Sequence, residues 1–114
     1  MPQVNKISKA PPAAVEKVLI QLGNNIRTAR LRRGWKQEDL ARRVGVSRYV
    51  VADIEKGKPS TAIASYLGAL WALGLLDDTN HVADPDNDTE GKALESARAP
   101  KTAAKRKQAL DNDF

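Results

Sequence analysis

The segment from Gln37 to Glu55 constrains the fold more than any other part of this sequence. It has the pattern of two short helices, about Gln37 to Val44 and about Arg48 to Lys56, separated by a very short turn at Gly45. Glycine adopts left-handed backbone angles without steric cost, and Ala41 is small enough for two helices to cross closely. Apolar positions recur on both sides of the turn: Leu40, Val44, Val46, Val51 and Ile54. The segment therefore predicts two tightly packed helices, the second capped by Ser47.

Helical periodicity also precedes and follows this pair. From Ala13 to Gly34, apolar residues recur at steps of three and four: Val15, Val18, Leu19, Leu22, Ile26 and Ala29. A further helix is expected from a cap at Ser60 or Thr61 to about Leu73, with inward-facing side chains at Ile63, Leu67, Leu70 and Trp71. A short helix follows over about Thr89 to Ala99. No stretch shows the alternation typical of a sheet, so the predicted class is all-α: a compact domain of about five helices with flexible termini.

Charge is distributed unevenly along the chain. The 114 residues carry a net charge of +5, yet residues 15–60 carry +6 and residues 61–90 carry −6. A basic block indicates a polyanionic partner, of which nucleic acid is the first candidate, although a solvated helix surface explains the charge equally well. The expected organisation is a disordered lead (1–12), a helical domain (13–78), an acidic linker with a short helix (79–100) and a basic flexible tail (101–114).

Several functional classes are disfavoured by composition. The chain has no cysteine and only one histidine, His81, so neither a disulfide framework nor a multi-histidine metal site is expected. Met1 to Pro12 lack the apolar run of a secretory signal, and a reducing cytoplasm is the expected compartment. The acids from Asp84 to Glu95 mimic the spacing of a calcium loop, but Thr89 stands where that loop needs glycine. We therefore expect no enzyme activity, no cofactor and no metal.

Four short motifs point to a known family. They are Ile26-Arg27-x-Ala29-Arg30, Gln37-x-x-Leu40-Ala41, Gly45-Val46-Ser47-Arg48 and Ile54-Glu55-x-Gly57. Together they make the stretch from Leu19 to Leu76 resemble the Xre/Cro/lambda-repressor family of helix-turn-helix DNA-binding domains. The resemblance implies a homodimer that binds an inverted-repeat operator in double-stranded DNA. It also implies that the helix after Ser47 lies in the major groove.

The same resemblance implies roles for individual residues. The expected base readers are Arg48, Tyr49 and Asp53, and Gln37 matches a position that bonds a backbone phosphate in relatives. Ser47 can bond a phosphate from its place at a helix N-terminus. Lys36, Lys58 and Ser60 flank the same face and are expected to contact phosphate as well, with solvated surface as the alternative interpretation of each lysine. Arg30 and Glu55 match positions that form a structural ion pair in relatives. Relatives usually place Thr or Ser at the position of Lys36, so the helix at Gln37 is expected either to rely on Glu38 and Asp39 at its start or to begin differently.

A second resemblance extends toward the C-terminus. The stretches Gly68-Ala69-Leu70-x-Ala72-Leu73-Gly74-Leu75-Leu76, Ala83-Asp84-Pro85-Asp86 and Gly91-x-Ala93-Leu94 look like HipB-like antitoxins that are partnered with HipA-type kinase toxins. This implies a nucleoid-associated autorepressor that also binds a kinase. The expected dimer contact comprises Leu67, Leu70, Trp71, Leu75 and Leu76. Two alternatives stay open: a stand-alone phage-type or metabolic repressor, and a protein inhibitor with secondary DNA binding.

Overall fold

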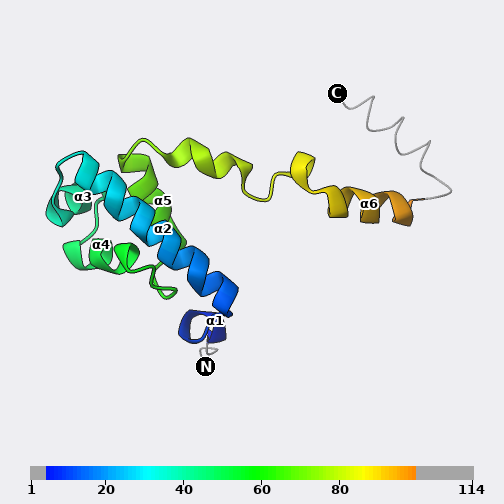
Figure 1. The fold of residues 1–114 in the computed structure, drawn as a ribbon, viewed down its shortest axis with the longest axis horizontal. Helices are drawn as coiled ribbons and strands as arrows, with labels where there is room; N and C mark the ends of the chain where they lie inside the picture. Colours follow the sequence, from blue (N-terminus) through cyan, green and yellow to red (C-terminus); the bar gives the residue numbers. More distant parts are fainter. Residues whose placement is uncertain (1–4, 100–114) are drawn as a thin grey trace. The chain divides into compact units, whose positions relative to one another are not determined.

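The structure, a computed structural model, describes residues 5–99, and every regular element within that range is helical. The all-α class is therefore confirmed. The chain divides into two compact units, Met1–Asp78 and Thr79–Phe114. In chain order the elements are α1 (Lys6–Lys9), α2 (Ala13–Arg32), α3 (Gln37–Val44), α4 (Arg48–Glu55), α5 (Ile63–Ala72), the 3-10 helices η1 (Leu76–His81) and η2 (Pro85–Asn87), and α6 (Thr89–Arg98) (Figure 1).

The first unit is built around helix α4. Helix α4 packs against α2, α3 and α5, and α3 also packs against α5. The side chains between these helices form one buried cluster: Ile26, Ala29, Leu40, Ala41, Val51, Ile54, Tyr66, Ala69, Leu70 and Leu73. Because Val51 and Ile54 are completely buried, the opposite face of α4 is the one left to solvent.

Two glycines allow α2 and the end of α4 to approach closely. A Cβ atom added at Gly23, inside α2, would lie 2.6 Å from the backbone oxygen of Ile54. A Cβ atom added at Gly57, just after α4, would lie 2.6 Å from the backbone carbon of Leu19. Real Cβ atoms do not approach backbone this closely, so both contacts require glycine. They set the distance between α2 and the loop that follows α4.

Helix α5 turns a different face inward from the one that its apolar pattern predicts. Ile63 is 74% exposed and Trp71 is 62% exposed, and Leu67 also lies at the surface. Tyr66 and Leu70 are buried instead, and the Tyr66 hydroxyl donates a hydrogen bond to the carbonyl of Lys58 at 2.7 Å. The prediction that Ile63, Leu67 and Trp71 face the core is wrong. The helix is apolar on both faces, so periodicity alone does not choose between them.

The ends of the helices follow from local hydrogen bonds. Helices α2, α3 and α5 are each followed by a glycine with positive φ, at Gly34, Gly45 and Gly74. Ser47 caps α4 by accepting the N–H of Val50 at 3.3 Å, as predicted. Helix α5 departs from prediction, because its N-cap is Ala62 and neither Ser60 nor Thr61 supplies a cap.

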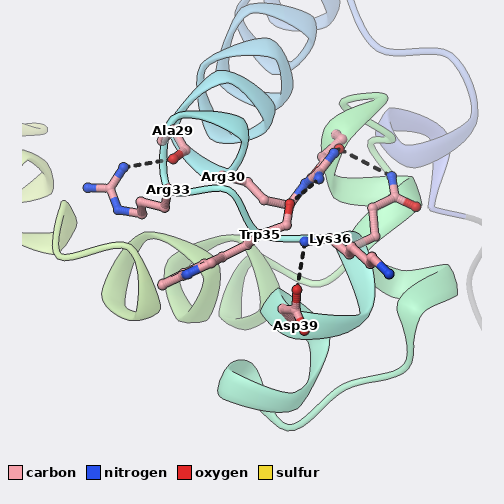
Figure 2. A network of polar contacts seen from close by, with 8 residues as sticks. Ala29, Arg30, Arg33, Trp35, Lys36 and Asp39 are labelled. Atoms are coloured by element: carbon pink, nitrogen blue, oxygen red, sulfur yellow. Dashed lines mark hydrogen bonds and ion pairs between the residues drawn. The ribbon is translucent and has the colours of Figure 1, made fainter.

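Helix α3 begins without a side-chain cap from Lys36. Instead, the Asp39 carboxylate accepts the N–H of Lys36 at 2.8 Å (Figure 2). The same carboxylate pairs with Arg42. The hydrogen bond from Lys36 and the charge of Arg42 hold the pKa of Asp39 below its ordinary value of 3.8. The expectation that this helix start relies on its own first-turn acids is confirmed for Asp39.

This hydrogen bond predicts a pH dependence of folding. Because the pKa of Asp39 is lower in the folded chain than in the unfolded chain, the ionised carboxylate stabilises the fold above pH 3.8. That contribution is lost as the pH falls through the folded-state pKa. We expect the free energy of unfolding to fall more for the wild type than for Asp39→Ala between about pH 7 and pH 2. Urea titrations at both pH values measure this, and equal losses would contradict it.

The remaining elements are short. Residues 1–12 are expected to be irregular, but the structure forms one helical turn, α1, within them. In the second unit, Asp88 caps α6 by accepting the N–H of Gly91 at 2.9 Å, close to the predicted helix start. Asp84 accepts the N–H of Asp86, so two acids of the calcium-like spacing serve as local caps. The predicted basic tail (101–114) lies outside the described residues.

Candidate nucleic-acid interface

The turn between α3 and α4 positions the candidate interface. Gly45 adopts a left-handed conformation with φ of 87°, and the N–H groups of Gly45 and Val46 both bond to the carbonyl of Ala41, at 2.8 and 3.1 Å. These bonds close the end of α3 and redirect the chain in two residues. The N-terminus of α4, where Ser47 caps the N–H of Val50, therefore emerges at the surface directly beside α3.

The exposed face of α4 carries the three residues predicted to read bases. Tyr49 is 68% exposed, and the guanidinium of Arg48 lies 5.1 Å from its ring centroid. Asp53 follows one turn later and is half-buried. Tyr49 and Glu38 raise the pKa of Arg48, so its guanidinium stays charged. All three side chains lie opposite the buried Val51 and Ile54, and the helix can thus present them to a partner while its other face stays packed.

A buried ion pair fixes how α4 is held. Arg30 on α2 donates to both carboxylate oxygens of Glu55, at 2.6 and 3.0 Å, and the two side chains are only 8% and 4% exposed. Arg30 also donates to the carbonyl of Trp35 at 2.7 Å, and Gln37 donates to Glu55 at 3.2 Å. Figure 2 shows Arg30 at the centre of this network, which joins α2, α3 and α4. A bidentate pair with satisfied neighbours is a rigid link.

The residues predicted to contact phosphate do not share one helix face, unlike the predicted base readers. Lys36, Lys58 and Ser60 are exposed around α3 and the loop after α4, and Ser47 lies at the N-terminus of α4. Lys58 already pairs with Asp53, with 3.1 Å between its Nζ and the carboxylate. The amide of Gln37 is directed to Glu55 rather than to solvent. In this conformation Gln37 therefore supports the ion pair, and only one of its amide donors is committed there.

A protein-family model described as a helix-turn-helix domain matches residues 21–81, which is more than half of the 114-residue chain. The chain belongs to this helix-turn-helix family. Over 55 residues, the helix-turn-helix chain is 27% identical to the antitoxin HipB of Escherichia coli O6:H1, an alignment that covers 48% of this chain and 58% of HipB. The chain thus spans less than two thirds of that relative's length. No solved structure matches. The family match and the likeness to HipB agree with the two resemblances that the sequence motifs indicate.

Three contacts of this helix-turn-helix chain were not predicted from its sequence. A carboxylate oxygen of Glu38 lies 3.4 Å from a guanidinium nitrogen of Arg48. The guanidinium carbon of Arg43 lies 4.0 Å from the ring centroid of Trp35. Arg33 donates to the carbonyls of Ala29 and Leu73, at 2.7 and 2.8 Å, and so ties α2 to the end of α5. The bond from Arg33 to Ala29 is local, but the contacts of Glu38 with Arg48, Arg43 with Trp35 and Arg33 with Leu73 join separate parts of the chain, so no local sequence signal marks these three. The relevant signal is an excess of Arg and Glu close to the turn.

The residues predicted to form a dimer contact are split between surface and core. Leu67 and Trp71 are exposed on α5, where Ile63 extends the same stripe at four-residue spacing. Leu70 packs in the core of its own chain, and Leu75 and Leu76 are half-buried against it. An interface on this face of the helix-turn-helix unit would therefore use Ile63, Leu67 and Trp71, with Leu70 behind them.

Residues 5–99 contain neither a cluster of metal-ligating side chains nor a helix that could span a membrane. No three His, Cys, Asp or Glu side chains in that range gather as a metal site would require. In the same range, no helix combines the length and apolar character needed to cross a membrane.

Proposed function

We propose that this protein is a sequence-specific, double-stranded DNA-binding repressor of transcription that acts without catalysis in the cytoplasm. The observation that supports this best is the exposed face of α4. It is held by a buried ion pair and a tight turn, and it presents Arg48 and Tyr49 at the end of the helix that family members place in the major groove. Arg48 can bond to O6 and N7 of a guanine, and Asp53 can accept from a cytosine amine.

A dimer on an inverted repeat is part of this proposal. The exposed apolar stripe Ile63, Leu67 and Trp71 is the surface that two chains would share. Two α4 helices related by a two-fold axis would then face successive major grooves, about 34 Å apart on one side of the duplex. Sedimentation of the full chain at micromolar concentration measures the oligomeric state.

The likeness to HipB favours an antitoxin role over a stand-alone repressor. In this reading the protein represses its own operon and binds a HipA-type kinase toxin. A phage-type or metabolic repressor without a toxin, or a protein inhibitor with secondary DNA binding, is the alternative. Co-purification of the chain with the product of its neighbouring gene distinguishes these hypotheses. Only the antitoxin hypothesis requires a kinase-like partner there.

DNA binding by this face predicts different outcomes for two substitutions. Arg48→Ala should cost about 1–3 kcal/mol on the specific site and little on random-sequence DNA, because the loss is of base contacts. Lys58→Ala should weaken binding to all sequences alike and reduce the slope of log K against log salt by about one, because the loss is of a phosphate contact. Fluorescence anisotropy with duplexes from the region upstream of the reading frame, at several salt concentrations, measures both.

Three outcomes would contradict the proposal or its assignments. Equal losses on specific and random DNA would make Arg48 a phosphate contact. An unchanged salt slope would remove Lys58 from the interface. If the wild-type chain ignores every duplex from its own upstream region even at low salt, the repressor proposal itself fails.

A further inference from the structure

The ion pairs of the described residues are concentrated on the candidate interface. Apart from the buried pair of Arg30 and Glu55, residues 5–99 form three ion pairs, and all three involve α3, α4 or the loop after α4. They join Arg42 with Asp39, Arg48 with Glu38, and Lys58 with Asp53. Two cations of the face that is proposed to bind DNA, Arg48 and Lys58, therefore already have a carboxylate beside them, and so does Arg42 on the adjacent helix α3.

Of the three acids in these pairs, Glu38 makes the fewest interactions that support the fold. Asp39 starts α3 by accepting the N–H of Lys36, and Asp53 is half-buried along α4. The side chain of Glu38 is 63% exposed, and within the described residues it forms its ion pair with the guanidinium of Arg48, which is itself 56% exposed. With Arg42, these two line an open depression of about 330 Å³ between the starts of α3 and α4.

A carboxylate in this place affects the two modes of DNA binding unequally. Random DNA offers Arg48 a single phosphate. The free energy gained from that contact must exceed the free energy lost when Arg48 leaves Glu38, together with the repulsion between Glu38 and the phosphates. A guanine offers two acceptors to one guanidinium, and bidentate bonds to a base are stronger and directional. The same ion pair therefore opposes non-specific contacts more effectively than specific ones.

We infer that Glu38 is a specificity-determining residue, whose carboxylate holds Arg48 away from phosphates and so lowers the affinity of the protein for random-sequence DNA. The inference rests on the proposed DNA-binding function and deepens it. It assigns a role to an acid that faces a negatively charged partner, where a residue selected for affinity alone would be basic or neutral.

The test compares Glu38→Gln with Glu95→Gln, which makes the same charge change on α6, outside the helix-turn-helix unit. The probe is a labelled random-sequence duplex about two helical turns long, titrated by anisotropy between about 50 and 200 mM salt. We expect Glu38→Gln to bind about two- to fivefold more tightly at the lowest salt. We also expect its salt slope to steepen by about one, because Arg48 gains a phosphate. Glu95→Gln should match the wild type, and melting curves check that each variant folds.

The Arg48→Ala background shows whether Glu38 acts through Arg48. There, adding Glu38→Gln should no longer change the salt slope, which a general charge effect or a folding defect would not explain. Unchanged or weaker binding of random DNA by Glu38→Gln, with the wild type still binding, would overturn the inference and leave the proposed function intact. An equal gain in Glu95→Gln would also overturn it. If neither the wild type nor Glu38→Gln binds the random duplex or any duplex from the region upstream of the reading frame, the proposed function fails instead.

Discussion

Replacing Arg30 with methionine is expected to lower the free energy of unfolding by about 3–5 kcal/mol. The substitution leaves the carboxylate of Glu55, which is only 4% exposed, without its cationic partner. It also removes the donor to the carbonyl of Trp35. For a domain whose total stability is about 5–15 kcal/mol, this loss is enough to populate the unfolded state. Urea denaturation followed by circular dichroism measures it.

Two matched variants separate the buried charge from other effects of Arg30→Met. Arg42→Met breaks an ion pair that is exposed on the Arg42 side, and should cost at most about 1 kcal/mol. Arg30→Met combined with Glu55→Met removes both buried charges and should recover a large part of the lost stability, because no uncompensated charge remains. If Arg30→Met is as stable as Arg42→Met, the buried pair of Arg30 and Glu55 contributes little to the stability of the fold.

Replacing Gly57 with alanine is expected to be clearly more destabilising than replacing Gly74 with alanine. Both glycines have positive φ, 71° and 77°, so both substitutions incur a backbone cost of about 1–2 kcal/mol. Only at Gly57 would the added Cβ meet the backbone of Leu19, whereas at Gly74 nothing lies within 4 Å of it. Overpacking of this kind adds about 1–3 kcal/mol. The difference in free energy of unfolding between the two variants measures the contact alone.

Gly57→Ala should also weaken DNA binding in the folded protein. The loop after α4 must move away from α2 to accommodate the methyl group, and Lys58 lies next in that loop. The distance of Lys58 from Asp53 and its position beside α4 would change when the loop moves. Equal stability losses in Gly57→Ala and Gly74→Ala would mean that α2 yields without cost, and that the close contact does not position the loop.

Much of the candidate site could be predicted because its signals are local. Gly45 requires only its own backbone angles, and Ser47 caps α4 through the N–H of Val50 three residues away. Asp39 likewise acts on Lys36 within one turn. Hydrogen bonds that close over three or four residues leave a readable pattern at fixed spacing. Helices α3 and α4 therefore begin where the sequence predicts, and α3 also ends there.

The contacts that could not be predicted join distant residues. Nothing near Glu38 marks Arg48 as its partner, and nothing near Gly23 or Gly57 marks α2 and the end of α4 as touching. The sequence of α5 is apolar on both faces, and the choice of Tyr66 and Leu70 for the core depends on the shape left by α3 and α4. Packing density selects one face of such a helix, and this selection is a property of the assembled core.

By itself, the sequence determined the all-helical class, the turn at Gly45 and the family to which the chain belongs, because backbone preference and apolar spacing act within a few residues. The tertiary structure decided which apolar stripe of α5 reaches solvent and which acid stands beside each cation of the interface. Those outcomes depend on how four helices, α2 to α5, fill a common volume, and only the folded chain brings their side chains within reach of one another.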